Sequence, residues 1–157
     1  MCYFGEGGKK NWPEARKYLK LAAEQGDVQA QSNYAVMCAE GKGGVQKLED
    51  ARNYFKLAGD QGYMQAQIHY LWMCYHGEGG EKDHKDARKY AKRAVEQKYL
   101  SVADPDYVSG QNLYAVMCYR GEGGEKNLAE ALHYLKRFAA EGDAEAKFII
   151  ADYYFTK

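Results

Sequence analysis

The sequence has no excess charge of either sign and no long hydrophobic run. Its 22 Lys and Arg residues balance 22 Asp and Glu residues, and all are scattered along the 157-residue chain. A surface that binds nucleic acid needs concentrated positive charge, so this pattern argues against nucleic acid as a partner. A membrane-spanning helix needs about 20 consecutive apolar residues, so we also expect no membrane insertion.

Large aliphatic side chains are scarce as well. Leu, Ile, Val and Phe together number 25, whereas the chain has 21 Ala and 15 Tyr. A low aliphatic content indicates disorder when the net charge is high, but the net charge here is zero. Small alanines let helices approach closely, and tyrosine rings fill the gaps between them. We therefore expect a single domain of closely packed helices over residues 1–157.

Three short motifs recur four times in the same order. The first is Met-Cys, which begins at Met1, Met37, Met73 and Met117. A Gly-x-Gly-Gly turn follows, which begins at Gly5, Gly41, Gly77 and Gly121. An Ala-x-x-Tyr motif comes next, which begins at Ala15, Ala51, Ala87 and Ala131. The spacing predicts four repeats, at approximately residues 1–36, 37–72, 73–116 and 117–157.

A repeat of 36 residues is typical of a pair of antiparallel helices in a solenoid. Around the second repeat, Asp27 is predicted to cap a first helix and Gly41 to end it. A second helix is predicted over residues 48–61. Small and aromatic residues at helical spacing mark the buried face of each helix. They are Ala30, Tyr34, Ala35 and Cys38 on the first helix, and Ala51, Tyr54, Phe55 and Ala58 on the second.

This pattern resembles the Sel1-like repeat (SLR) family, a relative of the tetratricopeptide repeat. The residues that match are Ala30, Tyr34, Ala35, Cys38, Gly41 and Gly43 for the first half, and Ala15, Tyr18, Ala22, Ala23 and Gly26 for the second. The resemblance implies an all-α fold, a right-handed α/α superhelical solenoid of helix-pair repeats. It also implies a role in assembling protein complexes.

The third interval between motifs is 44 residues instead of 36, which indicates an insertion of eight residues. We place it within residues 99–109, because Lys98 stands where the other repeats have a closing glycine. Asp104 and Pro105 then form a favourable helix start. Two interpretations stay open: a tolerated surface loop, or a contact element that exposes Leu100 and Tyr107.

The four cysteines hold the same place in successive repeats. Packed helix axes lie about 8–10 Å apart, whereas a disulfide needs Cα atoms within about 7 Å. We therefore expect Cys2, Cys38, Cys74 and Cys118 to be buried free thiols in the cytoplasm or another reducing compartment. The first residues, Met1 to Gly5, also lack the charged start and apolar core of a signal peptide.

No residue constellation points to catalysis or to a cofactor. His69 and His76 lie about two helical turns apart, too far to share a zinc ion. The Gly-x-Gly-Gly turns follow a helix and not a strand, which favours structural turns over phosphate-binding loops. No Ser, Thr or Cys stands out with a base and an orienting acid. We predict a protein that is not an enzyme and has no metal site and no cofactor.

The first helix of each pair is expected to line a concave groove, as in other solenoids. Side chains rotated off the buried face vary between repeats, while the buried framework changes little. Trp, Tyr and Arg, which often dominate interface energies, are among them. An alternative for Trp72 is that its ring fills a gap between helices. The residues predicted to contact a protein or peptide partner are Asn33, Val36, His69, Trp72, Tyr75, His76, Leu113, Val116, Tyr119 and Arg120.

The sequence therefore favours a protein-interaction scaffold, an adaptor that binds a peptide or partner helix in its groove. The alternative is an architectural segment of a larger repeat protein. A solenoid end that faces water is polar, whereas the last predicted helix, residues 147–155, is apolar on more than one face. On that interpretation the chain forms a homo-oligomer through Tyr3, Phe4, Phe148 and Phe155.

Overall fold

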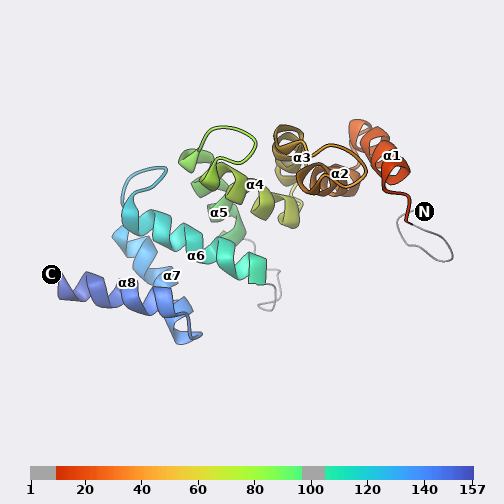
Figure 1. The fold of residues 1–157 in the computed structure, drawn as a ribbon. Helices are drawn as coiled ribbons and strands as arrows, with labels where there is room; N and C mark the ends of the chain where they lie inside the picture. Colours follow the sequence, from red (N-terminus) through yellow and green to blue (C-terminus); the bar gives the residue numbers. More distant parts are fainter. Residues whose placement is uncertain (1–9, 97–104) are drawn as a thin grey trace. The chain divides into compact units, whose positions relative to one another are not determined.

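The computed structural model describes residues 10–96 and 105–157, and this part of the chain contains eight α-helices and no strand. Figure 1 shows the helices in chain order. Their bounds are α1 Trp12–Glu24, α2 Val28–Glu40, α3 Leu48–Asp60, α4 Met64–His76, α5 His84–Glu96, α6 Pro105–Arg120, α7 Leu128–Ala140 and α8 Ala144–Phe155. The all-α fold class predicted from the repeats is confirmed.

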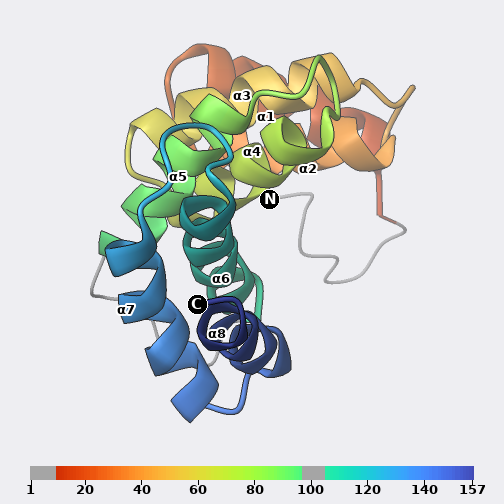
Figure 2. The ribbon, with the colours of Figure 1, turned by 90° about the vertical axis from the view of Figure 1, so that its left-hand side faces the viewer.

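The chain divides into two compact parts, an N-terminal unit of residues 1–82 and a C-terminal unit of residues 83–157. In the N-terminal unit α2 packs between α1 and α3, and α3 packs against α4. In the C-terminal unit α6 packs between α5 and α7, and α8 packs against α7 (Figure 2). That all repeats form a single domain stays a prediction.

Side-chain caps and glycines set the helix ends, as the sequence indicates. The Asp27 carboxylate accepts a hydrogen bond of 2.7 Å from the Ala30 amide at the start of α2. Asp83 does the same for the Asp86 amide at the start of α5, at 2.9 Å. Gly41 ends α2 in the left-handed conformation, at φ 69°. The predicted helix over residues 48–61 agrees with α3 to within one residue.

The core combines alanines with tyrosine and cysteine side chains. Ala35, Ala51 and Ala58 are fully buried, and Tyr34 is 4% exposed. The Tyr34 ring meets the half-buried Tyr54 ring edge to face, with centroids 4.9 Å apart. The scarcity of large aliphatic residues is thus offset by aromatic contacts between closely spaced helices.

In the three glycine turns that the structure describes, the second glycine of the Gly-x-Gly pair lies against the backbone at the start of the preceding odd-numbered helix. A Cβ atom on Gly79 would overlap the Leu48 carbonyl, and Gly79 has a φ of +67°. Only glycine satisfies both conditions, because other residues carry a Cβ and avoid this conformation. The same contact pairs Gly43 with Trp12 and Gly123 with His84.

A repeated arginine holds each of these turns. Arg52 on α3 donates one hydrogen bond of 2.8 Å to the Glu81 carbonyl and one of 3.4 Å to the Cys74 Sγ. The equivalent clamps join Arg16 to the Lys42 carbonyl and Cys38, and Arg88 to the Glu122 carbonyl and Cys118. The end of a helix leaves backbone carbonyls without hydrogen-bond partners. Each arginine donates a hydrogen bond to a carbonyl of this kind in the glycine turn that follows the next helix.

Among the residues described, no helix is both long and apolar enough to cross a bilayer.

We expect Gly79→Ala to lower the free energy of unfolding by about 3 kcal/mol or more. The left-handed conformation costs an alanine about 1–2 kcal/mol, and overlap with the packed backbone adds about 1–3 kcal/mol. The matched control is Gly62→Ala, since Gly62 has a φ of +89° but nothing within 4 Å of an added Cβ. Urea unfolding measures both; equal losses for the two variants would contradict a close backbone contact.

Candidate functional site

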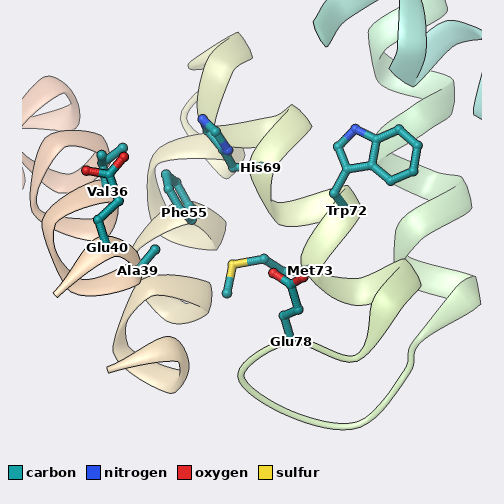
Figure 3. Close-up of a pocket in the computed structure, with 8 residues that line it drawn as sticks. All are labelled: Val36, Ala39, Glu40, Phe55, His69, Trp72, Met73 and Glu78. Atoms are coloured by element: carbon teal, nitrogen blue, oxygen red, sulfur yellow. The ribbon is translucent and has the colours of Figure 1, made fainter. Parts of the chain in front are cut away.

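A hollow in the N-terminal unit lies between α2, α3 and α4, with a volume of about 180 Å³. Figure 3 shows the residues around it: Val36, Ala39, Glu40, Phe55, His69, Trp72, Met73 and Glu78. Each helix contributes to it, and Glu78 comes from the glycine turn that follows α4. The hollow therefore combines an apolar floor with two carboxylates.

Aromatic side chains form two walls of the hollow. The His69 ring stacks on the buried Phe55 ring, with centroids 4.7 Å apart and planes 22° apart. The Trp72 ring stacks on His76 in turn, with centroids 5.5 Å apart, and meets Tyr75 edge to face. Trp72 thus contacts two other rings and also lines the hollow (Figure 3).

Two carboxylates, those of Glu40 and Glu78, are the acidic groups that line the hollow. The carboxylates of Glu40 and Glu78 are exposed, and Glu40 pairs with Lys42. Both side chains of this ion pair are nearly half exposed, at 48% and 46%. Exposed pairs contribute about 0–1 kcal/mol because water screens them, so a ligand can replace Lys42 at little cost.

The predicted contact residues of the N-terminal unit lie at the surface or close to it. His69 and His76 are exposed, and Asn33, Val36, Trp72 and Tyr75 are half-buried. The structure brings Val36, His69 and Trp72 together at the hollow. Sequence reasoning assigned Phe55 to the core and did not select Glu78. The signal for Glu78 was present, because a Glu follows the first glycine of the turn at Glu6, Glu78 and Glu122.

Two of the predicted contact residues in the C-terminal unit are core residues. Leu113 is 7% exposed and Val116 is 5% exposed, so their assignment to a partner surface is wrong. Both lie in α6, where every residue from Leu113 to Cys118 is buried, so helical spacing alone did not separate the buried face from the surface. We leave both out of the proposed surface.

Tyr119 and Arg120 reach the surface of the C-terminal unit. The half-buried Tyr119 donates a hydrogen bond of 3.0 Å from its hydroxyl to the Asp152 carboxylate on α8. This bond raises the pKa of Tyr119, because it stabilises the protonated phenol beside a negative charge. The exposed Arg120 lies 4.0 Å from the Glu122 carboxylate, an ion pair at the equivalent of the His76 and Glu78 positions.

A second, more open hollow in the C-terminal unit has a volume of about 360 Å³ and the opposite charge. Lys85, Lys89 and Lys92 line it together with Arg88, and Glu130 is its single carboxylate. The charged side chains that line the two hollows are therefore mainly of opposite sign.

The thiols and histidines of the described residues form no reactive cluster. Cys38, Cys74 and Cys118 are free and buried, whereas Cys2 lies outside the described residues. In the described part of the chain, no group of three or more His, Cys, Asp or Glu side chains is placed to hold a metal ion. The insertion assigned to residues 99–109 also falls mainly outside the described part, although α6 begins at the predicted Pro105.

The described helices repeat in pairs along the chain, and this defines the fold as an α/α solenoid of helix-pair repeats. The Sel1 repeat pattern matches residues 1–27, 28–63, 68–99 and 108–143, and the chain belongs to the Sel1 repeat family. One matched repeat, residues 28–63, contains α2 and α3. Proteins of this family are in general scaffolds for protein interaction and typically lack catalytic activity.

Two solved structures share the fold. A Sel1 repeat protein from Oxalobacter formigenes is 26% identical, with a TM-score of 0.75 over 93% of this chain and 57% of that one. A protective antigen of uropathogenic Escherichia coli strains that displays an SLR fold is 30% identical, with a TM-score of 0.76 over 97% of this chain and 31% of that one. The chain spans less than two thirds of either relative. No curated protein sequence matches it.

We expect Tyr34 to make the stability of the fold sensitive to alkaline pH. Burial, and then the hydrogen bond with Cys38, raise the pKa of Tyr34 from 10.0 to about 12. The stabilisation from the protonated phenol is complete below pH 10 and is lost as pH rises through about 12. The loss amounts to about 2–3 kcal/mol.

Urea unfolding under reducing conditions tests this at several pH values between 10 and 12. Tyr34→Phe removes the titrating group, so its free energy of unfolding falls less steeply with pH than that of the unsubstituted chain. Tyr18→Phe is the control, because Tyr18 is 60% exposed. Identical slopes for Tyr34→Phe and the unsubstituted chain would contradict the role of Tyr34.

Proposed function

We propose that this chain is a protein-interaction scaffold, and that the hollow between α2, α3 and α4 binds a peptide or helix of a partner. The observation that carries the proposal is the aromatic cluster at this hollow. His69 and His76 are exposed and Trp72 is half-buried, although each has an apolar face that water solvates poorly. Rings that combine apolar area with a polar group are the residue types that concentrate binding energy in interfaces.

Differences between the repeats support this assignment. The buried positions Met37, Met73 and Met117 are identical in three successive repeats. Three residues further along the helices, the corresponding side chains are Glu40, His76 and Arg120, and all are exposed. A constant frame with a varied surface is the arrangement expected of a scaffold that recognises a specific partner.

The C-terminal unit offers a second set of candidate contact residues, Tyr119 and Arg120. They correspond in the repeat to Tyr75 and His76, and we propose that they also contact a partner protein. The hydrogen bond from Tyr119 to Asp152 fixes the direction of the ring before any partner binds, which lowers the entropy lost on binding.

We expect Trp72→Ala combined with Tyr119→Ala to abolish capture of the partner in a pull-down from reducing lysate, read by mass spectrometry. Loss of one such ring costs about 2 kcal/mol or more, which is more than tenfold in affinity. Helical circular dichroism and the melting temperature are expected to stay near those of the unsubstituted chain.

Tyr119→Phe separates the ring from its hydroxyl and serves as the milder control, with capture retained. If the double variant unfolds, the rings belong to the core and the binding surface lies elsewhere. Capture of the same proteins by the folded double variant would rule out the proposed surface.

A second function, an architectural role through self-association, is favoured by the exposure of α8. Phe148 is 71% exposed and Phe155 is 91% exposed. Tyr154 holds the repeat position of Cys38, Cys74 and Cys118, which are all fully buried, yet it is 57% exposed. The face that is covered in α2, α4 and α6 is therefore uncovered in α8, and burying it against a second copy would remove apolar surface from water.

If this second function holds, sedimentation velocity detects a dimer or larger species whose fraction rises with concentration. Phe148→Glu combined with Phe155→Glu is expected to make the chain monomeric, because the substitutions place charges on the apolar contact. Val45→Glu is the control, since Val45 is 79% exposed and lies in a turn of the N-terminal unit. A chain that is monomeric at all concentrations without any substitution would exclude self-association.

A further inference from the structure

We propose that the hollow between α2, α3 and α4 is a pocket for one arginine side chain of the partner. The inference rests on the proposed function and specifies the chemistry of the ligand. It follows from three properties of the hollow: its size, its aromatic walls and its pair of carboxylates.

The size indicates a single side chain. Pockets for small molecules commonly have volumes of about 300–1,000 Å³, and this hollow has about 180 Å³. It is therefore too small for a typical cofactor or metabolite, whereas an extended peptide can place one long side chain in it. The peptide backbone would then lie over α2 and α4, which form the rim.

The aromatic walls favour a planar cation. His69 stacks on Phe55, and Trp72 lies three residues further along α4; all three line the hollow (Figure 3). A guanidinium group that lies against these rings makes cation–π contacts, which are strongest on tryptophan. The polarisable sulfur of Met73 adds a soft contact for the aliphatic part of the side chain. Arginine fits such walls better than lysine, because the lysine ammonium is compact, strongly hydrated and not planar.

The carboxylates at the edge of the hollow supply acceptors for a cation. Glu40 closes α2, and Glu78 lies in the turn after α4. Arg52 donates hydrogen bonds to the backbone carbonyls of Glu78 and Glu81 and so holds that turn. The backbone that carries the Glu78 side chain is therefore fixed before a ligand binds. Preorganised acceptors bind more tightly because less freedom is lost on binding.

The chain contains an internal precedent for this pairing. Glu122 corresponds in the repeat to Glu78, and its carboxylate lies 4.0 Å from the guanidinium of Arg120. At the position equivalent to Arg120 the N-terminal unit has His76, whose ring stacks on Trp72. Glu122 thus pairs with an arginine of the chain itself. For Glu78 we infer that an arginine of the partner takes the equivalent role.

The test uses a random-peptide phage library selected on the purified chain, followed by fluorescence anisotropy with the selected peptides. We expect peptides with one essential arginine. Replacement of that arginine by its neutral analogue citrulline should weaken binding about tenfold or more, and replacement by lysine should also weaken it. Higher salt should reduce the affinity of the arginine peptide, because the pairing is ionic.

Substitutions in the chain provide a matched pair. Glu78→Gln should weaken the arginine peptide about tenfold, whereas Glu81→Gln should change its affinity less than about twofold. The second substitution removes the same charge from the same turn, but Glu81 does not line the hollow. Equal effects of the two substitutions would overturn the pocket, because they would show only a general charge effect.

The outcomes separate this inference from the proposed function. Peptides that lose binding with Trp72→Ala but contain no essential arginine, or bind equally well with citrulline or lysine, overturn the arginine pocket and leave the scaffold function in place. If no selected peptide depends on Trp72, the proposed binding surface fails and the inference fails with it.

Discussion

The arrangement of the helices depends on the contact between each glycine turn and the helix that precedes it by one repeat. At this contact no side chain fits, since an added Cβ would overlap a backbone carbonyl. An arginine from the same helix then donates to the carbonyls of the turn and to a buried thiol. The contact therefore requires a position without a Cβ atom and also hydrogen bonds from the arginine. Both requirements are met only when successive helix pairs stack in one register. The three turn glycines are Gly43, Gly79 and Gly123, and the arginines are Arg16, Arg52 and Arg88.

This contact also explains the place of the cysteines. A thiol is small enough for a fully buried position and accepts a weak hydrogen bond from the guanidinium, as Cys74 does from Arg52. Recurrence of these thiols therefore has a structural cause in packing and hydrogen bonding. In the fourth repeat Leu132 stands where the other repeats have the arginine.

Because the turns are held by backbone contacts, the neighbouring helix surface is free to vary. The hollow in the N-terminal unit combines one residue that is identical in successive repeats, Met73, with residues that differ between repeats, such as His69 and Trp72. Its negative charge comes from Glu40 at a helix end and Glu78 in a clamped turn. A rigid frame and a variable lining are what a scaffold needs to hold a partner in a defined position.

The sequence by itself determined the repeat, the all-α class, the family and the helix ends, because glycines, caps and small residues act locally and recur at a constant spacing. It also indicated the surface positions His69 and Trp72. Only the tertiary structure decided that Leu113 and Val116 are buried, that Phe55 joins Glu40 and Glu78 around one hollow, and that Arg52 holds the next turn. These features depend on side chains from helices that are distant in sequence, and every residue of α6 from Leu113 to Cys118 is buried. Helical spacing shows which residues share a face, but the neighbouring helices decide which face is covered.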